Sequence, residues 1–349
     1  MTTSDPIRLA TRGSALATYQ ANRVRAALED HRHDVELVEV STRGDELREE
    51  LIHDLGKKGA FVHSVDQTVI DGEADAAVHS LKDVPTEDHA AVEVAAVPDR
   101  APAGDVLVTP DGAGIDDLPS GGTVGTASLR RGAQLQARRP DLTVEPLRGN
   151  VDTRIEKVLA PSLQREHQTR LDDDDADAAA WFEDRTELER RALGREIDTE
   201  YDAIVIARAG LERLDLPGDV PATPLPIPEF VPAPAQGALA VTANDEAVVT
   251  AIRRALDHPP TRVAVTTERT VLATLGGGCV APIGVHATIK GPVVLVRAQI
   301  LSLDGDQVIA DTRELPVEDH VDAARSFASD LADRGAADLV DAAREVTAE

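Results

Sequence analysis

The sequence contains a single cysteine, and its setting is one that could serve chemistry. Cys279 follows three glycines, Gly276–Gly278, and is reached from an apolar helical stretch, Val271–Leu275. A lone cysteine is often a small buried hydrophobe, so this loop alone favours neither a reactive nor a structural thiol. One cysteine excludes an intrachain disulfide, and no Cys/His spacing indicates a structural metal site.

Three predicted strand-to-helix turns carry arginine beside residues that cap helices. The first is Arg12-Gly13-Ser14, and the others span 125–131 and 148–154. Backbone N–H groups and the helix dipole attract an anion at such a helix start. A single turn of this kind is usually structural, because Ser and Asn cap helices routinely. Since arginine matches carboxylate or phosphate bidentately, three converging turns would suit a ligand with several carboxylates.

Asp83 is the candidate charged catalyst. A predicted strand, Ala74–Val78, runs into the polar segment His79–Asp83, and Pro85 prevents a helix from continuing directly. An aspartate near a turn is most often a cap. Beside clustered arginines, however, its carboxylate could stabilise positive charge in a substrate that the arginines hold through its acid groups.

The elements that must position these residues follow an alternating α/β pattern. The sequence predicts a helix over 14–29 and strands at 7–10, 35–40, 74–78, 92–97, 106–108, 123–125, 142–147 and 203–207. Pro- and Gly-rich joints at 98–104 and 217–234 indicate two crossings between lobes. After about Pro259, a helix, three strands (283–289, 293–301 and 308–315) and two helices indicate a separate small domain.

The composition is strongly acidic, with 63 Asp+Glu against 36 Lys+Arg and a net charge of -27. This balance suggests adaptation to high salt, where a Debye length of ~3 Å at 1 M screens self-repulsion. Nucleic-acid binding is disfavoured, because it requires a basic face. No apolar run approaches the ~20 residues of a membrane span, and no signal peptide is evident. We therefore expect a cytoplasmic protein that binds neither nucleic acid nor membrane.

Residues 159–199 are highly charged, with Asp172–Asp175 at the centre and Trp181-Phe182 isolated among polar neighbours. We interpret them as a solvated insertion that is partly helical over 185–195. A functional acidic arm is an alternative. A divalent-metal loop is disfavoured, because the glycine and alternating ligands of an EF-hand are missing.

Taken together, the motifs resemble the porphobilinogen deaminase (hydroxymethylbilane synthase) family over nearly the whole chain. Any one of them is weak, but their shared order is specific. In chain order they are Ala10–Ser14, Thr42–Asp45, Lys58–Phe61, His79–Pro85, Gly125–Arg131, Leu147–Asn150, Tyr201–Ile204, Ala209–Leu214, Gln236–Ala238 and Gly276–Gly284.

The resemblance implies an α/β fold with two lobes like those of type II periplasmic binding proteins. A small C-terminal α/β domain would carry the cofactor cysteine. Domain 1 would comprise 1–99 and 236–257, domain 2 would comprise 104–232 with the insertion at about 159–199, and domain 3 would comprise 259–349. We expect a monomer.

The resemblance also implies a transferase that joins four porphobilinogen molecules head to tail on a covalent dipyrromethane primer, releasing ammonia and hydroxymethylbilane. Cys279 would hold the primer through a thioether, and Asp83 would stabilise the positive azafulvene formed as ammonia leaves. Cofactor contacts would come from Ser80, Lys82, Thr126, Ser128, Arg130, Arg131 and Arg154. Substrate carboxylates would be held by Arg12, Ser14, Arg148 and Arg213.

Two functions of other classes stay open. A two-lobed binding protein without catalysis would account for the arginines, but not for Cys279 or a third domain. An acyl-transfer enzyme with Cys279 as nucleophile would need a histidine base, and His258 and His286 lie in no motif typical of such a pair. One departure from the family pattern is Asp54, which stands where a lysine is expected.

Overall fold

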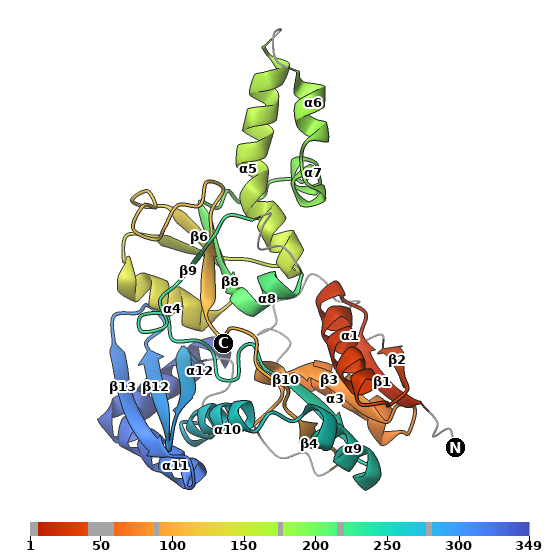
Figure 1. Ribbon diagram of the computed structural model, residues 1–349. Helices are drawn as coiled ribbons and strands as arrows, with labels where there is room; N and C mark the ends of the chain where they lie inside the picture. The colour runs from red at the N-terminus through yellow and green to blue at the C-terminus, as the bar shows by residue number, and fades with distance from the viewer. Residues whose placement is uncertain are drawn as a thin grey trace.

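A computed structural model describes residues 6–40, 59–86, 91–173, 177–214, 220–276 and 281–348. The described chain forms two five-stranded sheets and one three-stranded sheet (Figure 1). We call the units built on them lobe 1, lobe 2 and the C-terminal unit. None of the described helices combines the length and apolar character that crossing a membrane requires.

Lobe 1 is built on a sheet of order β2-β1-β3-β10-β4. Its strands are β1 (Ile7–Arg12), β2 (Val35–Val40), β3 (Ala76–Ser80), β4 (Glu93–Ala96) and β10 (Leu239–Ala243). The first three are parallel, and β10 runs antiparallel to both of its neighbours. Helices α1 (Ala15–Asp30) and α9 (Glu246–Leu256) pack against one face, where Leu9 is buried, and α3 (Gly59–Ile70) packs against the other, where Ala10 is buried.

Lobe 2 repeats this arrangement with the order β7-β6-β8-β5-β9. Its strands are β5 (Asp105–Val108), β6 (Thr123–Thr126), β7 (Thr143–Pro146), β8 (Ala203–Ala207) and β9 (Ala222–Pro224). Strand β5, which enters from lobe 1, is antiparallel to β8 and β9, as β10 is to its neighbours in lobe 1. Helix α4 (Leu129–Arg138) covers one face of the sheet and α5 (Val151–Leu171) the other. The two lobes therefore share one mixed α/β architecture, which confirms the expected α/β class with two similar lobes. The likeness to type II periplasmic binding proteins stays a prediction of the family resemblance.

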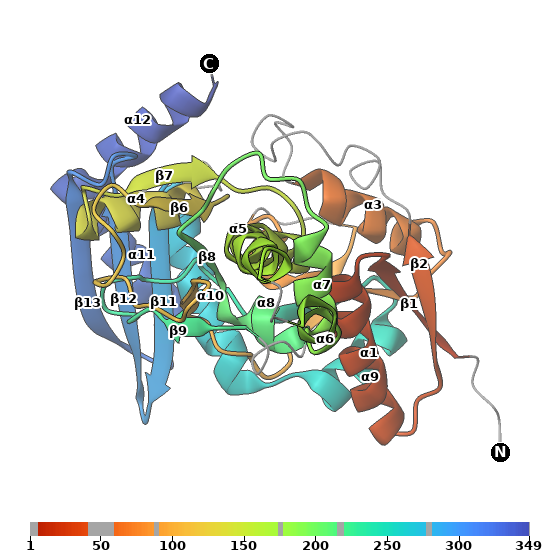
Figure 2. The ribbon, with the colours of Figure 1, turned by 90° about the horizontal axis from the view of Figure 1, so that it is seen from above.

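The C-terminal unit is a three-stranded antiparallel sheet covered by helices. Its strands are β11 (Ile283–Lys290), β12 (Val293–Leu301) and β13 (Val308–Pro316), and its helices are α10 (Pro259–Thr274), α11 (His320–Leu331) and α12 (Ala337–Ala348). The turn after β12 packs on α4, where a Cβ at Gly305 would lie 2.4 Å from the Ala133 carbonyl oxygen. In the view from above, the sheet lies beside lobe 2 (Figure 2).

The predicted strands are confirmed within two residues of their ends, but two strands were missed. The missed strands are β9 and β10, of three and five residues. Strand β10 consists largely of alanine and small apolar residues beside the Pro-rich crossing, so its local pattern did not separate it from the joint.

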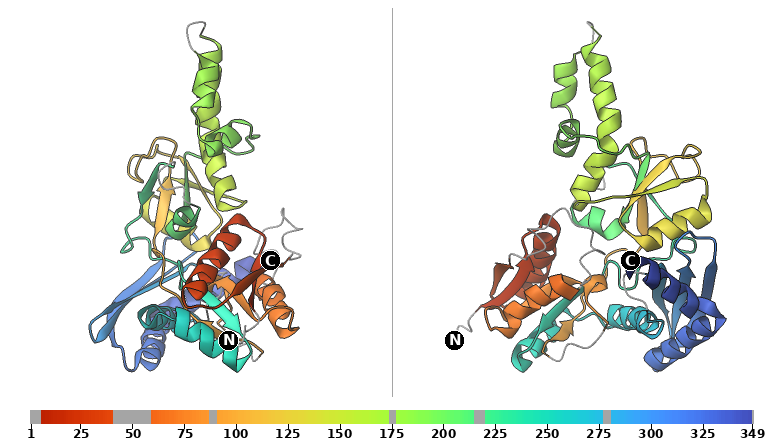
Figure 3. Two further views of the ribbon diagram at one scale, coloured as in Figure 1. Left: turned by 45° about the vertical axis from the view of Figure 1, so that its right-hand side comes forward. Right: turned by 180° about the vertical axis from the view of Figure 1, so that it is seen from behind.

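The insertion differs from the sequence-based expectation. Helix α5 extends to Leu171, and α6 (Ala178–Glu183) and α7 (Glu187–Leu193) return beside it, so that a helical hairpin projects from lobe 2 (Figure 3). Trp181 is buried and belongs to the same apolar cluster as Leu163 and Leu188. Helix α7 confirms the predicted helical part of the insertion at 185–195. The prediction that Trp181 is isolated among polar neighbours was wrong, because helical periodicity gathers the few apolar side chains on one face.

Candidate active site

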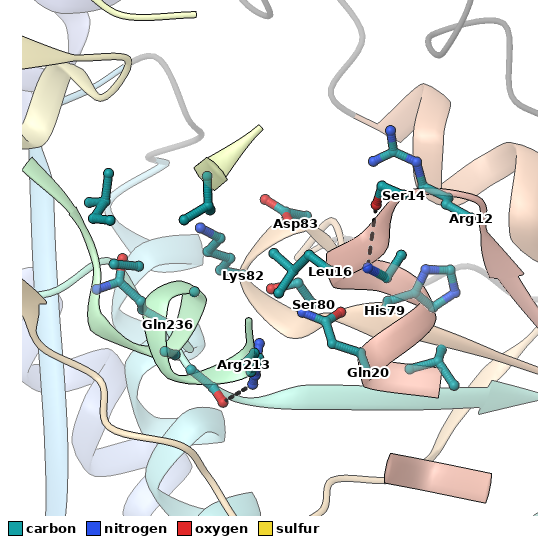
Figure 4. A pocket seen from close by; sticks show the side chains of 18 of the residues that line it. Arg12, Ser14, Leu16, Gln20, His79, Ser80, Lys82, Asp83, Arg213 and Gln236 are labelled. Atoms are coloured by element: carbon teal, nitrogen blue, oxygen red, sulfur yellow. Dashed lines mark hydrogen bonds between the residues drawn. The ribbon is translucent and has the colours of Figure 1, made fainter. Parts of the chain in front are cut away.

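A cavity lies between the two lobes, at the carboxyl ends of β1, β3 and β8, where open α/β sheets bind their ligands. Lobe 1 and the crossing segment contribute most of the residues that Figure 4 labels. Charged and polar side chains in the lining come from both lobes. They are Arg12, Ser14, Gln20, His79, Ser80, Lys82, Asp83, Arg131, Arg154, Arg213 and Gln236.

The turn after β1 is built as the sequence predicts. Ser14 caps α1, and its hydroxyl accepts the Ala17 backbone N–H at 3.3 Å. Arg12 ends the strand, and both side chains line the cavity. The predicted start of the helix and the arginine predicted to face a ligand thus lie together at the edge of the cavity.

Asp83 lies on a single 3-10 turn, Leu81–Asp83, that directly follows β3. Leu81 is buried and anchors the turn, while Lys82 and Asp83 line the cavity (Figure 4). The Leu81 backbone N–H also donates to the Ala238 carbonyl at 3.0 Å, which ties the turn to the segment leading into β10. The acid is therefore held on a short, well-anchored element at the centre of the site.

His79, one residue before Ser80, takes part in a buried network that the sequence did not reveal. Its Nε2 lies 2.7 Å from Oδ1 of Asp66 in α3, and the Thr242 hydroxyl donates to the same oxygen at 2.7 Å. His79 also lines the cavity. These contacts join α3, β3 and β10 directly behind the turn that carries Asp83.

In lobe 2, two of the predicted arginines bind a buried aspartate. Arg130 Nη2 donates to Asp105 Oδ2 at 2.8 Å, and Arg131 Nη2 donates to Oδ1 at 2.7 Å. Burial alone would raise the pKa of Asp105, but the two arginines outweigh it and hold the pKa well below its usual range. Arg131 lines the cavity as well, whereas Arg130 lies outside the lining, bonded to Gln134 and the Val231 carbonyl.

Arg154 and Arg213 face the cavity from α5 and α8 (Arg208–Arg213). Burial, followed by repulsion from Arg131, lowers the pKa of Arg154 to about 10. Burial, followed by repulsion from Arg23, lowers the pKa of Arg213 to about 10. Arg213 Nη2 donates to the Gly237 carbonyl (Figure 4), while its Nε is buried without a hydrogen-bond partner among the described residues. A ligand carboxylate that paired with either guanidinium would therefore stabilise its charged form.

The other predicted site residues lie apart from this lining. Thr126 is buried at the end of β6, and its hydroxyl accepts the Ser128 N–H at 3.2 Å. Ser128 caps α4 and accepts the Arg131 N–H at 3.5 Å. Arg148 lines a separate hollow with Lys157 and Tyr201 at the base of the hairpin. Cys279 and Asp54 lie outside the described residues.

The residues missed by sequence reasoning are those that hold the predicted ones. Asp105 begins a run of apolar residues, so an acid there reads as a strand start. Gln236 was quoted only as part of a motif, yet its Nε2 donates to Asp105 Oδ1 at 2.8 Å and to the Ala103 carbonyl at 2.6 Å. Their pairing across 131 residues has no local signal in the sequence.

Comparison with known proteins decides the family. The family model described as porphobilinogen deaminase, dipyromethane cofactor binding domain, matches residues 7–166 and 158–251, and the model for the C-terminal domain matches 263–333. The chain is 50% identical over 391 residues to a protein of Halobacterium salinarum named probable porphobilinogen deaminase, covering 98% of this chain and 99% of that one. The chain belongs to the porphobilinogen deaminase family.

Further relatives bear the same name in other lineages. The identity is 41% over 309 residues to a probable porphobilinogen deaminase of Methanopyrus kandleri, covering 87% of this chain and 86% of that one. It is 34% over 342 residues to the porphobilinogen deaminase of Campylobacter hominis, covering 97% and 99%. The motif-based recognition is confirmed. Porphobilinogen deaminases are hydroxymethylbilane synthases, which are transferases. The two matched stretches of the first model overlap at 158–166 in α5, where the predicted insertion begins.

Proposed function

We propose that this deaminase carries out its reaction in the cavity between the lobes. Four porphobilinogen molecules are joined head to tail on a dipyrromethane primer, with release of ammonia and hydroxymethylbilane. The observation that carries this placement is Asp83, the one acid that lines the cavity among the described residues, on a wall that also bears Lys82 and faces arginines of both lobes. This pattern suits a substrate with anionic side chains and a reacting centre that becomes cationic.

The cationic lining has a clear physical task. Each pyrrole brings two carboxylates into a chain of net charge -27, so the global field opposes binding and a local cluster must outweigh it. Arg12, Arg131, Arg154 and Arg213 supply that cluster, and Ser14, Ser80 and Lys82 add donors. Thr126, Ser128, Arg130 and Arg148 stay predicted contacts of the cofactor or substrate.

The lining fits a dipyrromethane group, whose carboxylates could pair with two buried guanidinium groups. The Nε of Arg213 is buried without a partner among the described residues, and burial disfavours the charge of Arg154. When bound, the primer supplies the pyrrole carbon to which each substrate is added. The Asp83 carboxylate accepts hydrogen bonds from the pyrrole N–H groups and stabilises the positive charge that develops as ammonia leaves.

Three further parts of the proposal concern the whole chain. The domains are 1–99 with 236–257, 104–232, and 259–349. The primer is attached through a thioether at Cys279 in the third domain. The protein acts as a monomer in the cytoplasm, with porphobilinogen as its small-molecule partner, and binds neither nucleic acid nor membrane; light scattering at several concentrations tests the monomer.

The primer is tested by the intact mass of the purified protein, with Cys279→Ser as the control. We expect an excess of two linked pyrrole units in the wild type and none in the variant. If the measured mass equals the mass calculated from the sequence, and the protein makes no tetrapyrrole from porphobilinogen, the protein is a binding protein with the family's fold.

Asp83→Asn tests the catalytic acid, because it keeps the shape and removes the charge. We expect the variant to carry the primer but to turn over at least 100-fold more slowly, about 2.7 kcal/mol of lost transition-state stabilisation. Porphobilinogen consumption measures the rate, and intact mass measures primer content. Near-normal turnover would refute the role of Asp83.

A further inference from the structure

Arg269 lies on α10 of the C-terminal unit, and its side chain reaches the turn of lobe 1 that carries Asp83. Its Nη1 donates to the carbonyl oxygens of Leu81 at 3.1 Å and Val84 at 2.8 Å. Its Nη2 donates to the Pro85 carbonyl at 2.6 Å. Among the described residues, these three carbonyls are the hydrogen-bond partners of Arg269. One guanidinium thus spans the whole segment around the acid.

Buried Leu81 anchors the start of the turn, and Arg269 binds its end, where the turn has few hydrogen bonds of its own. It contains three residues, and its closing bond, from the Val84 N–H to the Leu81 carbonyl, is 3.3 Å long. Pro85 has no N–H and cannot extend the turn. Among the described residues, the Val84 and Pro85 carbonyls therefore have no backbone N–H partner of the kind that a longer helix would provide. A planar fork with several donors can bind them together, which a lysine ammonium cannot do with the same geometry.

The cation is also matched to the electrostatics of the turn. Carbonyl groups at the carboxyl end of a helical turn bear partial negative charge and favour a nearby cation. Burial lowers the pKa of Arg269, so the charge is held at some cost in solvation. A side chain that only filled space between the two units could be apolar and avoid this cost. The three hydrogen bonds to the turn offset part of this cost.

We propose that Arg269 is a positioning residue for Asp83. It fixes the 3-10 turn so that the Asp83 carboxylate meets the pyrrole N–H groups; this inference rests on the catalytic role proposed for Asp83. Helix α10 ends at Thr274, and the chain reaches Cys279 ten residues after Arg269. The helix that fixes the acid is thus the one that leads to the proposed attachment point of the primer.

The same helix offers a matched control in Arg262. Its Nη2 donates to the carbonyls of Val94 at 3.4 Å and Ala95 at 3.1 Å, so it too links α10 to lobe 1, but at β4. It also pairs with Asp257 at 2.7 Å. Arg262→Ala therefore disrupts the same junction between units without touching the Asp83 turn.

The experiment compares Arg269→Ala with Arg262→Ala by steady-state kinetics, thermal unfolding and intact mass. We expect Arg269→Ala to lower kcat at least 30-fold with KM within about twofold and with the primer retained. Both variants should lower Tm by similar amounts, because each removes hydrogen bonds between α10 and lobe 1. Arg262→Ala should nevertheless keep kcat within about twofold of the wild type. Guanidinium chloride at tens of millimolar should restore part of the kcat of Arg269→Ala and none of that of Asp83→Asn.

Several results would overturn the positioning role. One is a kcat of Arg269→Ala within twofold of that of Arg262→Ala, and another is a change confined to KM. Loss of the primer, without rescue of kcat by guanidinium, would show a merely structural residue. If Arg269→Ala does not fold, Arg269→Lys is compared in its place, and a kcat near that of the wild type would contradict the need for the fork. An inactive wild type would instead refute the proposed function, and an active Asp83→Asn the catalytic acid.

Discussion

The two lobes share one strand order, yet they use corresponding turns differently. In lobe 1, the turn after the first strand presents Arg12 and Ser14 to the cavity. In lobe 2, the turn after β6 directs Arg130 and Arg131 onto buried Asp105, and only Arg131 also reaches the lining. The same local motif therefore faces the cavity in one lobe and is largely used for internal charge pairing in the other. An arginine at a strand-to-helix turn identifies an anion site without saying whether the anion is a ligand or part of the protein.

The largest effect is expected when the internal anion of lobe 2 is removed. Asp105→Asn leaves two buried guanidinium groups without their carboxylate, which should lower the free energy of unfolding by about 3–5 kcal/mol. The control in lobe 1 is Asp75→Asn, because the Arg8–Asp75 pair has side chains 38% and 27% exposed. That change should cost about 1 kcal/mol or less. Urea denaturation measures both, and equal losses would contradict the contrast between the lobes.

The stability that Asp105 contributes should also depend on pH in a defined direction. Its folded-state pKa lies below the unfolded value of about 3.9, so the contribution is complete above that value and is lost as pH falls through the folded pKa. The difference in unfolding free energy between wild type and Asp105→Asn should be constant from about pH 6 to 8 and narrow below about pH 4. A difference that widens in acid would contradict this assignment of charge.

A smaller effect of opposite sign is expected at Arg154, which lines the cavity and which we propose binds a ligand carboxylate. The lowered pKa of about 10 shows that the folded state without ligand disfavours its charge. Arg154→Met should therefore leave Tm unchanged or higher, while KM rises about tenfold, or about 1.4 kcal/mol. Thermal unfolding and steady-state kinetics test this. Arg165→Met on the same helix, where the arginine side chain is 66% exposed, should change neither quantity appreciably. A fall in Tm at constant KM would make Arg154 structural.

The smallest effects should come from the two capping serines, which occupy corresponding turns of the two lobes. Ser14→Ala and Ser128→Ala each remove a cap and should cost about 1 kcal/mol of stability. Ser14 lines the cavity, so its loss should also raise KM. Primer content by intact mass then tests whether Ser128 contacts the cofactor, as the family resemblance implies. An unchanged KM for Ser14→Ala would remove that side chain from the proposed binding surface.

Local sequence patterns predicted the elements well and their side-chain directions less well. The strands and the three arginine turns follow from periodicity and capping residues, which act over a few positions. The direction of Arg130 depends on Asp105, 25 residues earlier, and the support of Asp83 depends on Arg269, more than 180 residues later. The burial of Trp181 depends on Leu163 and Leu188 across the hairpin. Such pairings are set by the tertiary fold, and no single segment encodes them.

The helical hairpin connects the cavity to a distant point on the molecular surface. Helix α5 begins at the cavity, where Val151 and Arg154 line the wall, and runs for 21 residues, or about 30 Å, to Leu171 near the tip. A rotation of about 10° at its root would move the tip by about 5 Å. Because the chain has one native thiol, which the proposed primer would occupy, a cysteine introduced at exposed Leu171 could take a single spectroscopic label. A label there would report any rotation of α5 that accompanies chain growth, at a distance from the chemistry.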